Sequence, residues 1–270
     1  MCKSETRGFI FATTGEKYTN AARKAARNLR QAMPEAQIDL FTNQKIEDAV
    51  FDRIHPIKTN FFRPKMEAML NSRFDRTVCL DSDVVVLCDV TEMFDILDNT
   101  DLAIAHGRVR DKKFMHDDTV PRAFPVLNSG VVAYRRTRQV HGLLHEWLKK
   151  MREADAEVDQ GWLRDSMYHR RKSFIALPIE YNVVELQRLS YWPPSNGAPR
   201  ILHIHPLNDA ADDPLTPFDV ERFLSPRHWG RLKALIEADR HWPKSRRPVS
   251  PRRRRPFLQR LDDTLFRWGI

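Results

Sequence analysis

The sequence predicts an α/β protein with a mostly parallel sheet. Apolar runs at residues 8–13 and 38–42 are short, as in buried strands. Between these runs, alanine and leucine recur at helical spacing from about residue 17 to residue 33, and Pro34 ends the segment. A strand, a helix and a second strand in this order predict a right-handed crossover between parallel strands. In such sheets, ligands collect at the carboxyl ends of the strands.

The rest of the chain continues this alternation of short apolar runs and amphipathic segments. The expected strands lie at 78–80, 84–87, 101–106, 131–134 and 200–205, with a strand and a turn at 175–184. The expected helices lie at 90–97, 137–154, from 159 onward and within 220–239, and residues 60–70 are expected to be a loop that leads into a short helix. Residues 107–125 show no apolar periodicity, and a loop of that length in a compact domain is usually functional or disordered.

Length and composition restrict the class of protein. The chain has 270 residues, of which 41% are hydrophobic, enough for one large domain or one domain with a small appendage. No apolar run approaches the roughly 18 residues of a membrane-spanning helix, and the first residues lack the apolar stretch of a secretory signal. The three cysteines lack C-x-x-C spacing. We therefore expect a protein of the reducing cytoplasm.

Basic charge is concentrated near the C-terminal end. Residues 244–255 hold seven basic residues and no acidic one, and removing these seven lowers the formal net charge from +9 to +2. Residues 243–256 are rich in proline and arginine and cannot form a packed core. Residues 257–270 fit a short amphipathic helix, so the tail has the pattern of an anchor on an anionic membrane surface; the alternative is a solvated tail. The expected organisation is a domain at 1–217 and a helical appendage at 218–270.

An acidic triplet, Asp81-Ser82-Asp83, interrupts two apolar runs at 78–80 and 84–87. On an extended backbone, the two carboxylates point to the same side. Two like charges held close are unfavourable unless a cation lies between them. Mg²⁺ or Mn²⁺, bridging to phosphate oxygens, removes that cost. The simpler interpretation is a polar turn with Asp83 as a cap, but the position inside a hydrophobic run favours a metal site.

Residues 62–97 resemble the metal-binding core of nucleotide-sugar glycosyltransferases with the GT-A fold. The nearest resemblance is to glycosyltransferase family 8, which includes glycogenin and bacterial lipopolysaccharide galactosyltransferases. The resemblance continues through LNSGVVAY at 127–134, Asp-Gln at 159–160 and ILHIH at 201–205, and covers roughly residues 7–205. Each motif alone is weak, but four motifs in the family's order are fairly specific.

The resemblance implies a GT-A fold, with a Rossmann-like sheet, flanking helices and a small C-terminal helical appendage. It also implies an enzyme that moves a sugar from a nucleoside diphosphate, most commonly UDP, to an acceptor hydroxyl. Such transfer depends on a divalent metal, and in this family the anomeric configuration is retained. The sequence leaves open both the sugar and the acceptor, which is a glycan, a lipid-linked molecule or a protein.

Two clusters are expected to hold the donor. In the resembled family, the turn with Thr13, Thr14 and Tyr18 holds the nucleobase and ribose; the alternative is an ordinary turn with Tyr18 packed on the sheet. Similar proteins place a basic residue near Arg63 or Lys65, against the donor sugar or its phosphates. A surface position on a solvated helix is the alternative for both.

The N-S-G and D-Q motifs are expected to lie at the sugar. The family motif places Asn128 on the donor sugar, with Ser129 beside it, and uses the small Gly130 for close backbone approach; an ordinary turn is the alternative. Asp159 and Gln160 at a helix start would face the anomeric carbon. An N-cap role for Asp159 is compatible with this placement and does not decide the question.

Two histidines complete the expected metal site. His203 and His205 alternate about one residue, so both point to one side of a strand. The family's metal histidine is followed by a glycine and Lys-Pro-Trp; here Pro-Leu-Asn follows at 206–208, which leaves the diphosphate-binding lysine without a match. The expected donor contact inside the triplet is Ser82, and the expected ligands of Mn²⁺ or Mg²⁺ are Asp81, Asp83 and His203, with His205 as the fallback.

Two other functions use similar residues. A sugar-nucleotidyltransferase also needs carboxylates and a divalent ion, but the turn at residues 13–15 lacks the glycine-rich phosphate loop of that chemistry. A non-catalytic protein that binds anions or nucleic acid through its tail is the other candidate. The chain carries no recognisable nucleic-acid-binding motif, so nucleic acid is not the expected partner.

Overall fold

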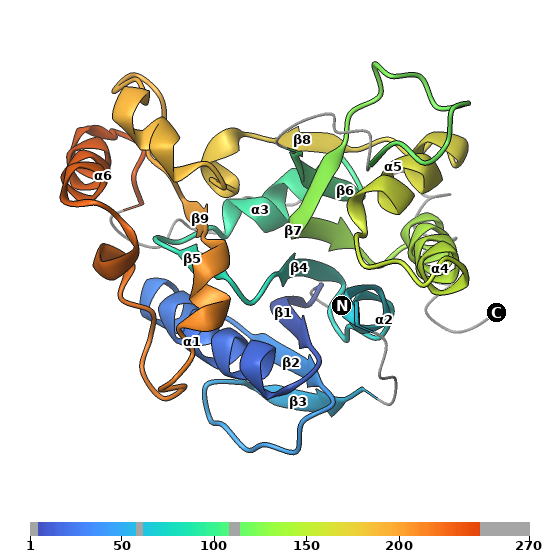
Figure 1. Ribbon diagram of the computed structural model, residues 1–270, viewed down its shortest axis with the longest axis horizontal. Helices are drawn as coiled ribbons and strands as arrows, with labels where there is room; N and C mark the ends of the chain where they lie inside the picture. The colour runs from blue at the N-terminus through green and yellow to red at the C-terminus, as the bar shows by residue number, and fades with distance from the viewer. Residues whose placement is uncertain (1–4, 58–61, 108–113, 244–270) are drawn as a thin grey trace.

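The computed structural model describes residues 5–57, 62–107 and 114–243. Its centre is a seven-stranded sheet in the order β3-β2-β1-β4-β7-β6-β8 (Figure 1). Six strands run parallel and β7 runs against them. The strands are β1 (Arg7–Thr13), β2 (Ile38–Thr42), β3 (Arg53–Pro56), β4 (Arg76–Leu80), β6 (Leu102–His106), β7 (Leu127–Arg135) and β8 (Ile175–Leu177).

Helices cover both faces of the sheet, which confirms the α/β class and the mostly parallel sheet. The α-helices are α1 (Glu16–Ala32), α2 (Lys65–Leu70), α3 (Glu92–Asp95), α4 (Arg138–Glu153), α5 (Gln160–His169) and α6 (Pro226–Ala238). The 3₁₀ helices are η1 (Ile96–Asp98), η3 (Ile179–Tyr181), η4 (Leu186–Tyr191), η5 (His205–Asp209) and η6 (Val220–Phe223).

Alternation along the strands divides the core into two layers. Phe9 and Phe11 of β1 pack in one cluster with α1, α3 and α6, whereas Ile10 packs in the other with α2, α4 and α5. Helix α1 turns a stripe of alanines and Leu29 to the sheet, and its small residues let the helix lie close to β1 and β2. The predicted strand-helix-strand start is therefore confirmed.

A second, two-stranded sheet holds the predicted strand around residues 200–205. There β9 (Ile201–His203) pairs antiparallel with β5 (Val84–Val86), and Val84 lies opposite His203. The acidic triplet turns the chain out of the main sheet after β4, so β5 and β9 pair beside it. This register brings His203 next to the triplet from about 120 residues away in sequence.

Two strand predictions need correction. The N-S-G motif was expected ahead of a strand at 131–134, but β7 already begins at Leu127 and buries residues 128–130 within it. Edge strand β3 was not predicted, because its side chains are half or fully exposed and form no apolar run.

The segment after residue 217 packs on the same core as the strands. The side chain of Asn28 in α1 donates to the backbone carbonyl of Phe218 (3.1 Å) and accepts from its N–H (2.9 Å). Leu232 and Leu235 of α6 are buried in the cluster that contains β5 and β9.

The domain boundary near residue 217 stays a prediction. The basic tail and the amphipathic segment at 257–270 lie outside the described residues, and within the described part no helix is both long and apolar enough to cross a membrane.

Candidate active site

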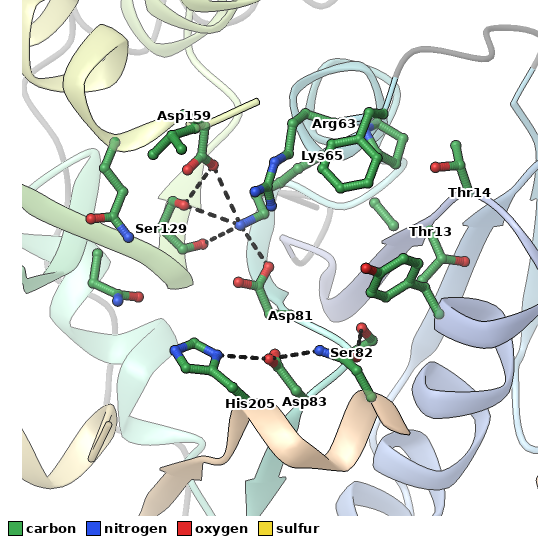
Figure 2. Close-up of a pocket in the computed structure, with 18 of the residues that line it drawn as sticks. Thr13, Thr14, Arg63, Lys65, Asp81, Ser82, Asp83, Ser129, Asp159 and His205 are labelled. Atoms are coloured by element: carbon green, nitrogen blue, oxygen red, sulfur yellow. Dashed lines mark hydrogen bonds and ion pairs between the residues drawn. The ribbon is translucent and has the colours of Figure 1, made fainter. Parts of the chain in front are cut away.

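A cavity of about 350 Å³ lies at the carboxyl ends of β1 and β4 (Figure 2). The start of β7, which runs the other way, and the start of α5 complete its wall. Gly130 is buried within β7 and is not among the residues that line the cavity. The predicted site residues that line the cavity are Thr13, Thr14, Tyr18, Arg63, Lys65, Asp81, Ser82, Asp83, Asn128, Ser129, Asp159, Gln160, His203 and His205.

Asp83 is the centre of a group of possible metal ligands. Its Oδ1 lies 3.2 Å from Nε2 of His203, and its Oδ2 lies 3.1 Å from Nδ1 of His205. The three ligand atoms of this group lie within 4.8 Å of one another. Burial raises the pKa of the Asp83 carboxyl, but the two imidazoles lower it further, so the pKa lies well below its usual range. Asp83 is therefore ionised.

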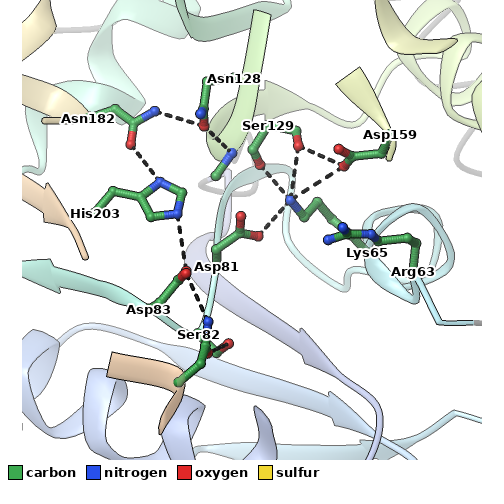
Figure 3. A network of polar contacts seen from close by, with 12 residues as sticks. Arg63, Lys65, Asp81, Ser82, Asp83, Asn128, Ser129, Asp159, Asn182 and His203 are labelled. Carbon is green, nitrogen blue, oxygen red and sulfur yellow. Dashed lines mark hydrogen bonds and ion pairs between the residues drawn. The ribbon is translucent and has the colours of Figure 1, made fainter. Parts of the chain in front are cut away.

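A chain of hydrogen bonds determines that Nδ1 of His203 carries a proton (Figure 3). The backbone N–H of Gly130 donates to Oδ1 of Asn128 (2.8 Å), so this atom is an acceptor. Asn182 then donates its amide group to the same oxygen (2.9 Å) and turns its own Oδ1 to His203 Nδ1, 3.1 Å away. His203 Nδ1 must therefore carry the proton, because it faces an acceptor.

With Nδ1 engaged, Nε2 is the nitrogen of His203 that remains to bind a cation, and it lies toward Asp83. It is buried and has no hydrogen-bond partner among the described residues, although Asp83 Oδ1 is 3.2 Å away. A divalent cation bound between Nε2 and the Asp83 carboxylate would give both atoms a partner. A histidine whose other nitrogen is fixed by a hydrogen bond is the usual arrangement of a metal ligand. The residues present therefore fit a divalent cation.

Asp81 belongs to a second cluster, around Lys65 (Figure 3). Its Oδ1 lies 2.6 Å from Lys65 Nζ, which also donates to the backbone carbonyl of Ser129 (2.8 Å). Ser129 Oγ donates to Asp159 Oδ2 (2.7 Å). Burial lowers the pKa of Lys65, but the carboxylates of Asp81 and Asp159 raise it more, so its pKa lies above the ordinary value and the ammonium stays charged.

Asp159 and Gln160 lie where helix α5 begins. Asp159 occupies the N-cap position, but its side chain accepts from Ser129 rather than from the first turn of α5. Trp147 Nε1 donates to the Asp159 carbonyl (3.0 Å) and so fixes the helix start. Gln160, the first residue of α5, lines the cavity. Helix capping therefore does not explain where the Asp159 carboxylate lies, because the hydrogen bond from Ser129 holds it instead.

The opposite end of the cavity is more apolar. Tyr18 and Phe62 lie edge to face, with ring centroids 6.4 Å apart, and half of Phe62 is exposed. Arg63 Nε donates to the backbone carbonyl of Glu157 (2.7 Å), which holds the guanidinium at the rim. Thr13 Oγ1 is bonded to Thr19 Oγ1 (3.0 Å) and is buried.

Two asparagines of the site were not predicted. Asn182 orients His203, as described above. Asn208, in η5, donates to Asp83 Oδ2 (2.9 Å) and accepts from Ser82 Oγ (3.0 Å). Asn208 follows the histidines where the family pattern has its Lys-Pro-Trp region, so the departure from that pattern was a signal that pointed to this segment. Asn182 had no comparable signal.

The mostly parallel α/β sheet places carboxylates and imidazoles beside the carboxyl end of β4, where ligands collect in such sheets. The family described as nucleotide-diphospho-sugar transferase matches residues 25–205. The chain therefore belongs to this family. No curated protein matches the sequence.

Solved glycosyltransferases share the fold. GlyE of Streptococcus pneumoniae TIGR4 is 20% identical with a TM-score of 0.52; the match covers 89% of this chain and 66% of GlyE. An active-site mutant of LgtC is 14% identical with a TM-score of 0.50, covering 88% of this chain and 98% of LgtC. The bifunctional glycosyltransferase WbbM is 16% identical with a TM-score of 0.50, covering 90% of this chain and 51% of WbbM. These similarities confirm the GT-A fold, and the chain spans slightly less than two thirds of GlyE.

Proposed function

We propose that the protein transfers a sugar from a UDP-sugar to an acceptor hydroxyl, with a divalent cation held by Asp83, His203 and His205. The observation that carries this proposal is His203 Nε2, which is buried without a hydrogen-bond partner among the described residues and lies 3.2 Å from Asp83 Oδ1. A cavity of about 350 Å³ with polar and aromatic walls is of the size that cofactor-sized ligands occupy. Asp81 remains a further proposed ligand, next to Asp83 in the triplet.

The ligand types favour Mn²⁺ over Mg²⁺. Mg²⁺ prefers oxygen ligands in octahedral geometry, whereas imidazole nitrogen is a ligand of transition metals. Two imidazoles and one carboxylate offer two nitrogens and one oxygen from the protein.

Transfer breaks the bond between the anomeric carbon and the diphosphate oxygen and joins that carbon to the acceptor oxygen, while the acceptor proton leaves with the diphosphate. The sugar gains oxocarbenium character and the diphosphate gains charge. A cation held by Asp83, His203 and His205 would supply Lewis-acid stabilisation of the departing diphosphate. Arg63 at the rim offers further positive charge, and Asp159 and Gln160 stabilise the cationic face of the sugar, with retention of configuration.

We assign the acceptor to a second cavity at the same edge of the sheet. This cavity of about 250 Å³ lies at the carboxyl ends of β6 and β8, and Asn182 lines it while bonding to Asn128 of the first cavity. Leu177 and Ile179 give it an apolar wall. His106, Glu185 and Arg188 supply polar groups, with Arg188 paired to Glu185. An apolar wall can pack against the face of a sugar ring while the polar groups bind its hydroxyls, so the cavity suits a sugar ring of a glycan acceptor.

The test is a panel of nucleotide sugars incubated with the protein and Mn²⁺. Release of UDP from one UDP-sugar, with retention at the anomeric carbon, is the expected result. Pyrophosphate exchange would instead identify a nucleotidyltransferase. Inertness toward every donor, together with salt-sensitive DNA binding, would favour an anion-binding role of the tail.

A further inference from the structure

Lys65 is a buried cation between two carboxylates. It begins helix α2, and only 8% of its side chain is exposed. Nζ lies 2.6 Å from Asp81 Oδ1 and 3.8 Å from Asp159 Oδ2. Figure 2 shows Asp81 between Lys65 on one side and Asp83 with His205 on the other. Lys65 therefore faces the metal-ligand cluster across the Asp81 carboxylate.

All three hydrogens of the ammonium have acceptors in the protein. They are directed to Asp81 Oδ1, to the Ser129 carbonyl (2.8 Å) and to Ser129 Oγ (3.1 Å). Because Ser129 Oγ accepts from Lys65, its own hydrogen is free to go to Asp159 Oδ2, 2.7 Å away. One lysine thus orients Asp81 directly and Asp159 through Ser129.

We propose that Lys65 is a positioning residue, which orients both carboxylates and supplies the one positive charge that they share. This inference rests on the proposed transferase function of the pocket. Two carboxylates share one ammonium, so the cluster of Lys65, Asp81 and Asp159 keeps one net negative charge, next to the ionised Asp83. The ammonium competes with a divalent cation for Asp81, and it keeps Asp159 aimed into the cavity at the start of α5.

This arrangement has a consequence that a purely structural lysine lacks. Removing the ammonium leaves Asp81 and Asp159 without their cation, so the pocket attracts a divalent cation more strongly. Turnover nevertheless falls, because Asp159 loses the hydrogen-bonded chain that orients it. A merely structural lysine would instead lose stability, metal binding and turnover together.

The experiment compares Mn²⁺ binding without donor, kcat and KM for UDP-sugar hydrolysis, and thermal unfolding. Lys65→Met keeps the aliphatic stem and removes the charge; we expect Mn²⁺ to bind about threefold or more tightly and kcat to fall about tenfold, with KM changed less. Lys65→Arg keeps the charge and should restore Mn²⁺ affinity toward wild type.

Lys24→Met is the matched control, because Lys24 is buried and donates to the Asp213 carbonyl (2.8 Å) away from the pocket. Its Mn²⁺ affinity should equal that of the wild type.

A folded Lys65→Met that binds Mn²⁺ equally or more weakly overturns the proposal. If Lys65→Met does not fold, Ser129→Ala decides, because it breaks the link to Asp159 without changing charge. Its Mn²⁺ affinity should equal wild type and its kcat should fall about tenfold; an unchanged kcat overturns the proposal. A wild-type protein that neither binds Mn²⁺ nor releases UDP contradicts the transferase function itself, and this inference with it.

Discussion

The imidazole of His203 packs directly on the backbone of Gly130, although the two residues belong to different sheets. A Cβ atom at position 130 would lie 2.4 Å from Cε1 and 2.6 Å from Nδ1 of His203, closer than real Cβ contacts come. The glycine of the N-S-G motif thus makes room for a proposed metal ligand. The same glycine's N–H begins the hydrogen-bond chain that orients this ligand.

Gly130→Ala is therefore expected to weaken Mn²⁺ binding about tenfold or more without altering any ligand, because the new methyl group displaces His203. Calorimetry of Mn²⁺ binding measures this. Gly230→Ala in α6 is the control, since a Cβ there meets nothing within 4 Å; it should leave Mn²⁺ affinity unchanged and stabilise the helix by up to about 1 kcal/mol. Normal Mn²⁺ affinity in Gly130→Ala would contradict the assignment of His203 as a ligand.

The two histidines should differ in their effect on the metal. His203 is buried and held by Asn182, whereas 67% of the His205 side chain is exposed. His203 is therefore preorganised, and we expect His203→Ala to raise the dissociation constant of Mn²⁺ more than His205→Ala does. Titration of both variants with Mn²⁺ decides the order. A larger effect of His205→Ala would make His205 the principal histidine ligand.

Alanine variants of Asn128 and Gln160 should distinguish contact with the donor sugar from the orientation of the metal ligand His203. If both face the donor, each change to alanine should lower kcat about tenfold or more, equivalent to roughly 1.4 kcal/mol. Asn128→Ala also removes the acceptor that orients Asn182, so it should weaken Mn²⁺ binding, whereas Gln160→Ala should not. UDP affinity in Gln160→Ala should stay near wild type. Lost UDP binding with unchanged kcat would move Gln160 away from the sugar.

The basic tail is proposed to hold the protein at an anionic membrane surface on the cytoplasmic side. Each of the seven lysine and arginine residues at 244–255 can contribute about 1 kcal/mol near such a surface. In sedimentation with vesicles, the full chain should pellet with anionic lipid at low salt and remain in solution with neutral lipid. A chain ending at Pro243 should not pellet with either. Equal behaviour of the two chains would remove the membrane role and leave the catalytic account intact.

Much of the fold follows from local patterns. The first strand, α1 and β2 were predicted because apolar runs and helical spacing report burial directly. Edge strand β3 escaped prediction because its exposed side chains carry no such pattern. The chain at 107–125 was expected to form a loop without regular structure, and the described part from 114 onward is held on α5. There Arg164, fully buried, donates to the carbonyls of Pro121 (2.8 Å) and Phe124 (3.2 Å). An arginine inside a helix gives no sequence signal of such burial.

Most residues that line the candidate site were named from the sequence, but Asn182, Asn208 and the pairing of the side chains were not. Asp81 is paired with Lys65, and Asp83 with the two histidines. Their joint binding of a cation stays a prediction. Pairing of this kind depends on contacts between residues far apart in the sequence. Only the register between β5 and β9 and the packing of α2 against the sheet set these contacts, so motif spacing could not reveal them.

The most direct test of the central claim is metal-dependent release of UDP from a UDP-sugar, measured for the wild type and for Asp83→Asn under the same conditions. Asparagine keeps the shape of the side chain and removes the charge that faces both histidines. The account predicts that the wild type releases UDP only with Mn²⁺ or Mg²⁺, that chelation with EDTA stops it, and that folded Asp83→Asn is slower by about a hundredfold or more. Near-normal release by Asp83→Asn, or release by the wild type in EDTA, would contradict it.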